Sequence, residues 1–234
     1  MILKDIIEYI DNRIPKDFGL EDDNIGFQGE YDLNQEIDSI YILMDLYRED
    51  DLRFSEENIL IVTHHPPLFT PKTPTYTIHS NWDIIDGGAN ESVANILGLD
   101  IVDVFDKKTG IGRVCKFNGD FKSFKSTVSS IFSNVRIVNQ VEDNKQVNNI
   151  GVISGFGLKN PEYIKLASDL DLDILISGDL TQETAVLASY LDITLIDLGH
   201  HDSEVPGLYD LKNILSKLNI PIVVLNKKPW VDLS

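Results

Sequence analysis

The stretch LDILISGD, at residues 172–179, decides the fold class, because a short apolar run ends there in a small polar turn. A helical pattern follows it at residues 181–191. The same alternation extends on both sides, with apolar runs at 149–157, 193–199 and 221–226 and helical patterns at 161–169 and 205–218. Repeated strand–helix units predict an α/β fold with a largely parallel or mixed sheet.

The N-terminal half is expected to contribute further strands and helices. Apolar residues at helical spacing predict a helix that begins near Leu3 and is closed by Pro15. The runs IYILMDL (40–46) and NILIVT (58–63) are typical of strands that are buried on both faces. We therefore expect two lobes, at residues 1–112 and 113–234. A helix that follows the glycine pair at 87–88 should direct three apolar side chains inward: Val93, Ile96 and Leu97.

The balance of charge argues against one class of partner. The chain of 234 residues carries 38 acidic against 20 basic side chains, a formal net charge of −18. Such a surface repels phosphate backbones, so binding to nucleic acid or to an anionic membrane is not expected. No uncharged apolar run approaches the roughly 20 residues that span a bilayer. The single cysteine, Cys115, is expected to be a core residue, which fits a soluble protein of the reducing cytoplasm.

All five histidines lie in loops that follow predicted strands: His64, His65, His79, His200 and His201. Carboxylates accompany them in the segments HSNWD and GHHDSE. In doubly wound sheets, ligands gather beyond the carboxyl ends of the strands. A structural role accounts for any single histidine, but five of five in three such loops indicate a binding site.

The residue types in these loops favour a metal centre, because imidazole and carboxylate groups are common ligands of transition metals. Without thiolates, the donors suit Fe, Mn, Zn, Co or Ni. Their number exceeds the roughly three protein donors of one catalytic zinc ion. The count indicates a pair of divalent ions, with Asp83 and Glu204 as bridging carboxylates.

The spacing of the donors leaves two local questions open. In an extended chain, the adjacent His64 and His65 hardly bind one ion from the same side. They therefore serve two ions, or one binds and the other supports it. His200 and Glu204 lie four residues apart, which suits a loop histidine and a first-turn glutamate, with Ser203 as the helix cap.

Six segments in order resemble the motifs of one known family. LIVTHHPPLF (60–69), HSNWDIIDGGANESVANILG (79–98) and GHHDSEVPGL (199–208) are similar to its three ligand motifs. Further matches are DDNIGFQG (22–29), TGIGRV (109–114) and ISGDLTQET (176–184). The chain thus resembles the Nif-three-like family, also known as GTP cyclohydrolase 1 type 2 homologues or domain of unknown function 34, from about residue 20 to 208.

The resemblance implies two intertwined α/β lobes with mixed sheets and a dinuclear metal centre between them at the C-terminal ends of strands. It also implies a homo-oligomer, commonly a toroidal homohexamer. Motif matching assigns the ligands of two divalent transition-metal ions per chain to His64, His65, Asp83, His200 and Glu204.

Four polar residues beside these ligands are candidates for supporting them or orienting a substrate: His79, Asn81, Asp179 and His201. The chain departs from the family pattern at Asp22, where Trp is frequent, and at Asp179, where Glu is usual. Both departures concern the shape of the pocket and leave the ligand set unchanged.

Two functions are consistent with these expectations. The first is a metal-dependent hydrolase that acts on a nucleotide or phosphoester, and ring opening of GTP is the version that the family label suggests. The second is a non-catalytic regulatory or metal-trafficking protein. The sequence shows no catalytic acid apart from metal-bound water, so the sequence does not rank the two.

Overall fold

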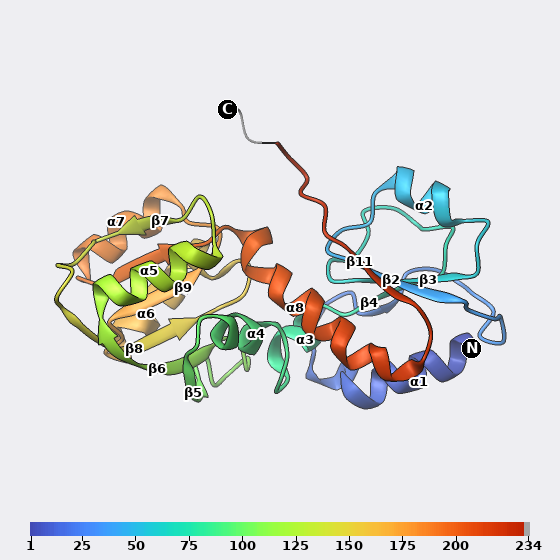
Figure 1. Cartoon of the computed structure of the whole chain (residues 1–234), viewed down its shortest axis with the longest axis horizontal. Helices are drawn as coiled ribbons and strands as arrows, with labels where there is room; N and C mark the ends of the chain where they lie inside the picture. Colours follow the sequence, from blue (N-terminus) through green and yellow to red (C-terminus); the bar gives the residue numbers. More distant parts are fainter. Residues whose placement is uncertain (232–234) are drawn as a thin grey trace. The chain divides into compact units, whose positions relative to one another are not determined.

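The computed structural model describes residues 1–231, which form two compact units. Unit 1 comprises Met1–Gly88 and the segment from Leu208 onward, and unit 2 comprises Ala89–Gly207. The chain therefore leaves unit 1 and returns to it, as the colours in Figure 1 show. The predicted lobe boundary between residues 112 and 113 falls inside unit 2, where β5 (Asp100–Val104) and β6 (Arg113–Asp120) pair with each other.

Unit 1 contains a five-stranded mixed sheet in the order β1-β4-β3-β2-β11. Only β1 is antiparallel to its neighbour, and the other four strands are parallel. The bounds are β1 (Gly26–Phe27), β2 (Ser39–Leu43), β3 (Ile59–Thr63), β4 (Thr75–Thr77) and β11 (Ile222–Leu225). Strand β3 is buried along its whole length, as its uninterrupted apolar sequence predicts.

Helices and short 3-10 turns complete unit 1. They are α1 (Leu3–Arg13), η1 (Lys16–Phe18), α2 (Arg48–Phe54), α3 (Ser80–Ile84), the C-terminal part of α8 (His200–Leu215) and η3 (Ser216–Leu218). Helix α1 buries Leu3, Ile6, Ile7 and Ile10, which confirms the helix predicted from their spacing.

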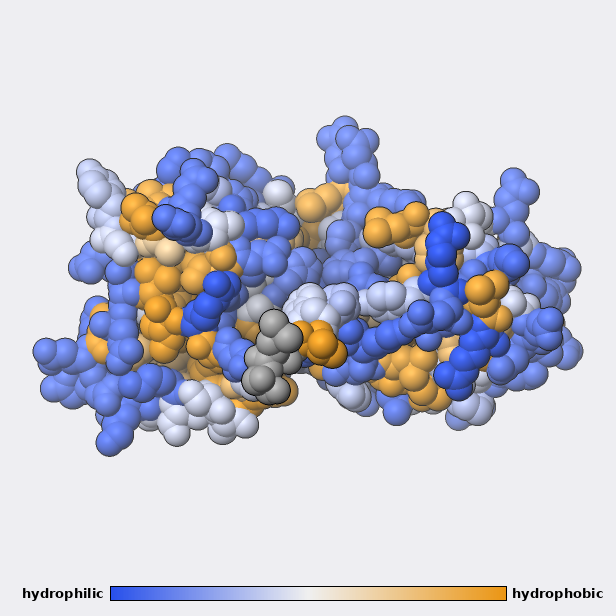
Figure 2. Space-filling view, turned by 90° about the horizontal axis from the view of Figure 1, so that it is seen from above, coloured by the Kyte–Doolittle hydropathy of each residue, from blue (hydrophilic) through white to orange (hydrophobic). Residues whose placement is uncertain are grey.

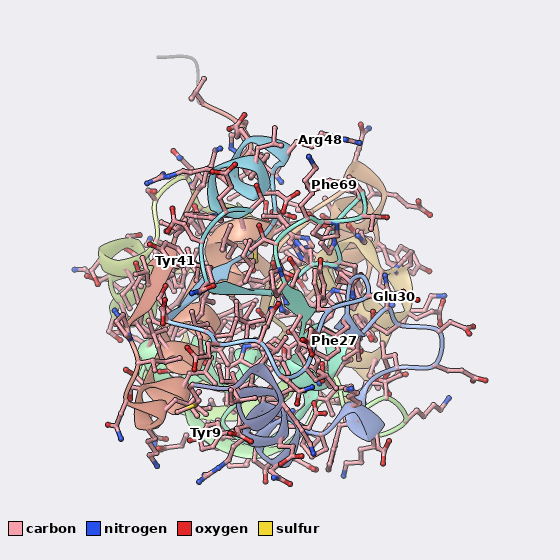
Figure 3. The ribbon with its side chains drawn as sticks, turned by 90° about the vertical axis from the view of Figure 1, so that its right-hand side faces the viewer. Tyr9, Phe27, Glu30, Tyr41, Arg48 and Phe69 are labelled. Carbon is pink, nitrogen blue, oxygen red and sulfur yellow. The ribbon has the colours of Figure 1, made fainter. Side chains whose placement is uncertain are left out.

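Helix α2 was not expected, because its sequence REDDLRF has little apolar periodicity. Tertiary contacts hold it instead. The ring of Phe54 packs in a buried cluster and lies 4.6 Å from that of Tyr41, centroid to centroid. Arg48, the first residue of α2, lies over the ring of Phe69, with its guanidinium carbon 4.9 Å from the ring centroid (Figure 3).

Unit 2 contains a six-stranded mixed sheet in the order β5-β6-β8-β9-β10-β7. Strands β8 (Gln146–Val152), β9 (Ile174–Ser177) and β10 (Thr194–Asp197) are parallel, whereas β5, β6 and β7 (Arg136–Val138) pair antiparallel. The helices are α4 (Ala89–Ile96), α5 (Phe121–Ile131), η2 (Gly157–Lys159), α6 (Pro161–Asp169), α7 (Gln182–Tyr190) and the start of α8. The predicted α/β class with mixed sheets is confirmed.

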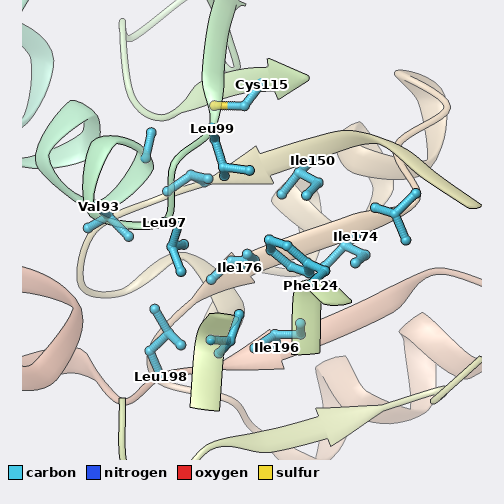
Figure 4. Packing of buried hydrophobic residues seen from close by; sticks show 14 of the residues in the cluster. Val93, Leu97, Leu99, Cys115, Phe124, Ile150, Ile174, Ile176, Ile196 and Leu198 are labelled. Atoms are coloured by element: carbon cyan, nitrogen blue, oxygen red, sulfur yellow. The ribbon is translucent and has the colours of Figure 1, made fainter. Parts of the chain in front are cut away.

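The core of unit 2 lies between the sheet and helices α4 and α5 (Figure 4). Phe124 of α5 packs with Ile174 and Ile176 of β9 in this cluster. Leu175 lies between these two isoleucines and points to the opposite face, because successive side chains of a strand alternate. Cys115 belongs to the same core, as predicted, and is completely buried.

Two local predictions are wrong. Ile96 is largely exposed, because the buried face of α4 is defined by Val93, Ala94 and Leu97, and Ile96 falls beside that face. Ser203 does not cap α8, because the helix already begins at His200. The hydroxyl of Ser203 instead donates to the carbonyl oxygen of His200 (2.7 Å) inside the first turn.

The surface agrees with the acidic composition. Hydrophilic residues cover most of the face shown in Figure 2, and apolar residues form separate patches between them. Within residues 1–231, no helix combines the length and the apolar character that crossing a bilayer demands.

Candidate metal centre

Three imidazoles gather at the C-terminal edge of the unit 1 sheet. His64 and His65 directly follow β3, and His79 follows the neighbouring parallel strand β4 after one residue. Because β3 and β4 are adjacent and parallel, their ends deliver these side chains to one edge of the sheet. The ring centroids of His64 and His65 are 5.0 Å apart, and His79 lies 5.2 Å from His64 and 5.5 Å from His65.

One ring nitrogen of each histidine lies within 4.8 Å of the others, so the three could hold a metal ion. The expectation that adjacent histidines hardly bind one ion from the same side applied to an extended chain, and the chain is not extended here. The backbone explains the difference. The amides of His64 and His65 donate to the consecutive carbonyl oxygens of Leu43 and Met44, both at 2.9 Å. In a regular strand, consecutive amides point in opposite directions, so the chain is bent here rather than extended.

Each of these imidazoles is held through Nδ1. Nδ1 of His65 donates to Asp45 Oδ1 (2.9 Å), Nδ1 of His79 donates to Asp23 Oδ1 (2.8 Å), and Nδ1 of His64 donates to the carbonyl oxygen of Ile78 (3.2 Å). All three partners only accept hydrogen bonds, so they place the proton on Nδ1 and leave Nε2 as the ligand atom.

Several hydrogen bonds hold Asp23, the acceptor of His79, in place. Asp23 also accepts from the amide of Ser80 (3.0 Å) and from its hydroxyl. Burial alone would raise the pKa of Asp23, but the hydrogen bonds from Ser80 and His79 lower it, so Asp23 remains an anion. Burial, together with the neighbouring His64, lowers the pKa of His79 and favours its neutral form, although Asp23 acts in the other direction.

Helix α3 brings Asp83 to the same edge. Its Oδ1 lies 3.6 Å from Nε2 of His64, and both side chains are almost completely buried. Two ligands bound to one ion lie roughly 3.0–3.4 Å apart at the usual bond lengths, so this separation suits a shared ion. Asn81 serves the loop itself, because its side chain accepts from the amide of His79 (2.9 Å) and donates to the carbonyl oxygen of Ile14 (3.2 Å).

Unit 2 carries a second donor cluster at the start of α8. Nε2 of His200 lies 3.1 Å from Oε1 of Glu204, one helical turn later. Nδ1 of His200 donates to Oδ2 of Asp179 (3.0 Å), and Nζ of Lys159 donates to the same oxygen (3.1 Å). Asp179 follows β9 and adopts a left-handed backbone conformation, with φ of 63°.

The charges of this cluster differ from those of unit 1. Burial alone would lower the pKa of His200, but the hydrogen bonds and charges of Asp179 and Glu204 raise it to about 9. In turn, the hydrogen bond from His200 lowers the pKa of Asp179 despite partial burial. Without a metal, His200 is therefore an imidazolium at neutral pH, held by two carboxylates.

Gly155 shapes the cluster from the loop after β8. Its φ is +76°, and a Cβ atom at this position would lie 2.3 Å from Oε1 of Glu204 and 3.4 Å from Nε2 of His200. The amide of Gly155 donates to the hydroxyl of Ser203 (2.9 Å), which ties the loop to α8. Only glycine allows this close approach of backbone to the buried carboxylate.

The structure therefore divides the five predicted ligands between the units. His64, His65 and Asp83 lie in unit 1, and His200 and Glu204 lie in unit 2. Their union into one centre stays a prediction. His201 is buried in α8 and donates from Nδ1 to Asp202 Oδ1 (3.2 Å).

Sequence reasoning missed three supporting residues: Asp23, Asp45 and Gly155. Asp45 had a usable signal, because it follows β2 just as the histidines follow β3 and β4. Asp23 lies 56 residues before His79, and its signal was its place in the matched segment DDNIGFQG (22–29). The donor chemistry of both clusters suits a transition metal, since imidazoles and carboxylates are presented without thiolates.

Comparisons with known proteins agree with this fold. The family model described as Duf34/NIF3 (NGG1p interacting factor 3) matches residues 1–77 and 72–229. A protein of Methanothermobacter thermautotrophicus named GTP cyclohydrolase 1 type 2 homolog is 34% identical over 228 residues, which cover 97% of this chain and 94% of the relative. A protein of the same name from Methanocaldococcus jannaschii is 32% identical over 250 residues, covering 97% and 100%.

Solved structures show the same architecture. Reduced HcgD from Methanocaldococcus jannaschii superposes with a TM-score of 0.85 at 30% identity, over 97% of this chain and 98% of that one. Staphylococcus aureus protein SA1388 shares the fold, with a TM-score of 0.81 at 19% identity over 100% and 99% of the two chains. The chain belongs to the Duf34/NIF3 family.

Proposed function

We propose that this protein is a metal-dependent hydrolase of nucleotides or phosphoesters. In this proposal His64, His65 and Asp83 of unit 1 and His200 and Glu204 of unit 2 form one dinuclear centre. The observation that carries the proposal is the shared construction of the two clusters. In each, an imidazole is held through Nδ1 by a carboxylate, and a buried carboxylate lies beside an imidazole Nε2.

The two bound ions would supply an activated water and positive charge for the oxyanion that forms in the transition state. The chain's own residues prepare the centre for them. Asp45 and Asp179 keep the proton of His65 and of His200 on Nδ1, so that each Nε2 can bind. Asp83 and Glu204 provide the negative charge that offsets the cations.

Exposure leaves room for a substrate. The side chains of His64 and Glu204 are only 2% and 4% exposed, whereas those of His65 and His200 are 23% and 28% exposed. Each cluster thus has a buried donor and an accessible donor. Lys159, held beside Asp179, adds a positive charge at which a phosphate oxygen of the substrate would bind.

The names of the relatives support the nucleotide version, since those proteins are called GTP cyclohydrolase 1 type 2 homolog. The burial of Asp83, His64 and Glu204 favours a second candidate, a non-catalytic metal-binding or metal-trafficking protein, because buried donors can hold an ion without contact to a substrate.

We also propose a homohexamer from the family resemblance. Light scattering coupled to gel filtration tests this oligomeric state directly.

A turnover assay distinguishes the two candidates. Untagged protein is loaded with Fe, Zn, Mn, Co or Ni and assayed on GTP, other nucleotides and model phosphoesters. The hydrolase predicts turnover that follows the metal content and is lost in Asp83→Asn. Asp86→Asn is the matched control, because Asp86 is exposed and lies three residues away. Full metal content without turnover on any of these substrates would support the trafficking candidate instead.

A further inference from the structure

We propose that His79 is a metal ligand, and that His64, His65 and His79 form a three-imidazole site that binds one divalent transition-metal ion with donors of unit 1 alone. This assigns to His79 a role beyond that of a supporting residue. The proposal shares His64 and His65 with the proposed function, but it concerns metal binding only and fails or succeeds independently of hydrolysis.

His79 is held in the same way as two of the predicted ligands. Three histidines in the described chain donate Nδ1 to a carboxylate of another segment: His65 to Asp45, His79 to Asp23 and His200 to Asp179. A carboxylate behind Nδ1 is the usual support of a metal-binding imidazole, since it fixes the tautomer and the ring orientation. His79 has this support in the same form as the other two.

The three imidazoles also converge on one point. One ring nitrogen of each of His64, His65 and His79 lies within 4.8 Å of the other two. Nδ1 of each ring donates to another group, so an ion would bind through Nε2. Three nitrogens on one tetrahedral ion lie roughly 3.4 Å apart, so binding would draw the three nitrogens together by at most about 1.4 Å.

Several hydrogen bonds hold the loop that carries His79. Asp23 accepts three hydrogen bonds from this loop, one from the imidazole and two from Ser80. Asn81 accepts from the backbone amide of His79. Such a network fixes a side chain in one orientation, which is what a ligand position requires.

The chemistry defines the class of ion. Three imidazoles with a fourth position for water are the donor set of a catalytic zinc site, and the same set binds Co²⁺ or Ni²⁺. Neutral donors leave the charge of the ion uncompensated, so the nearby carboxylate of Asp83 adds to its attraction. Unit 1 therefore contains enough donors to take up an ion before those of unit 2 contribute.

The test uses the full chain in the double variant His200→Ala/Glu204→Gln, which removes the donors of unit 2. Apo protein is titrated with Co²⁺, and bound cobalt is measured by its visible absorption and by elemental analysis. We expect about one ion per chain and the intense bands of a four-coordinate site. Adding His79→Ala should weaken binding by more than about 100-fold, the upper end of what losing a supporting residue costs.

Two controls keep the result specific. Asp103→Asn in the same background changes an exposed carboxylate of unit 2 and should leave cobalt affinity unchanged. Asp23→Asn keeps the imidazole of His79 but weakens its support, and should lower affinity about 10-fold; it also serves as the test if His79→Ala does not fold.

Three outcomes contradict the proposal. One is a double variant that binds no cobalt, and another is unchanged affinity after His79→Ala. The third applies if His79→Ala does not fold, and is unchanged affinity after Asp23→Asn. Wild-type protein is titrated in parallel. If it binds two ions per chain while one of these outcomes is observed, the role of His79 is contradicted but the dinuclear centre is not. Fewer than two ions in the wild type would count against the dinuclear centre instead.

Discussion

The two donor clusters are built from the same residue types but differ in the number of donors. In unit 1 the carboxylates of Asp23 and Asp45 accept hydrogen bonds from Nδ1 of His79 and His65. In unit 2 the carboxylate of Glu204 lies directly beside His200, whose pKa is raised to about 9. Unit 1 thus gathers three imidazoles and the carboxylate of Asp83, whereas unit 2 pairs a single imidazole with the carboxylate of Glu204. Loss of one donor should therefore matter less in unit 1, which has more donors, than in unit 2.

The largest effect should come from the cluster with fewer donors. Glu204→Gln leaves only His200 of the two predicted ligands in unit 2, and we expect the loss of one ion per chain. His65→Ala leaves two imidazoles and Asp83 in unit 1, so it should weaken binding without abolishing it. Elemental analysis after equilibrium dialysis measures both. Equal losses of bound metal in the two variants would contradict this difference between the units.

A slightly smaller effect is expected from Gly155→Ala. The new Cβ would meet Oε1 of Glu204 at 2.3 Å, and φ of +76° is strained for alanine. The carboxylate must therefore move, which should lower the affinity of unit 2 for its ion. The strain should also destabilise the fold by about 1–3 kcal/mol, measured by urea denaturation of the apo protein. Gly87→Ala is the matched control, since φ is +76° there and the space around it is open.

The supporting carboxylates should have intermediate and similar effects. Asp45→Asn and Asp179→Asn each weaken the acceptor behind one predicted ligand, and the expected cost is about 10–100-fold in metal affinity. Isothermal titration with Zn²⁺ measures it. Asp103→Asn, on an exposed edge strand, should change nothing. A large loss in only one of the two would show that the clusters are supported differently.

The smallest effect concerns the core of unit 2, away from both clusters. Cys115 is completely buried, and burial raises the pKa of its thiol to about 12. The reactive thiolate is therefore scarce and inaccessible at pH 8. A thiol reagent such as Ellman's should label the native protein at the rate of global unfolding, with full labelling in denaturant. Rapid labelling of native protein would contradict this packing.

The sequence predicted those features that depend on local pattern. Parallel strands such as β3 and β9 are short apolar runs that end in polar turns, so both the α/β class and the donor-bearing loops could be located. The bend at His64 and His65 could not, because it depends on backbone hydrogen bonds to Leu43 and Met44 of another segment.

Features that depend on distant partners were missed. Helix α2 forms because Phe54 packs against Tyr41, although its own sequence is polar. The orientation of His79 depends on Asp23, and no periodicity connects the two. The start of α8 was placed too late because Ser203 resembles a cap, whereas its hydroxyl in fact bonds within the helix and to the loop of Gly155.

The central claim is that donors of both units form one dinuclear centre. Its most direct test is a crystal structure of the metal-loaded protein with anomalous diffraction at the metal edge. We predict two peaks per chain about 3.5–4 Å apart, bound by His64, His65 and Asp83 together with His200 and Glu204. Two distant peaks, each bound by residues of one unit only, or no peak at these residues, would contradict the account.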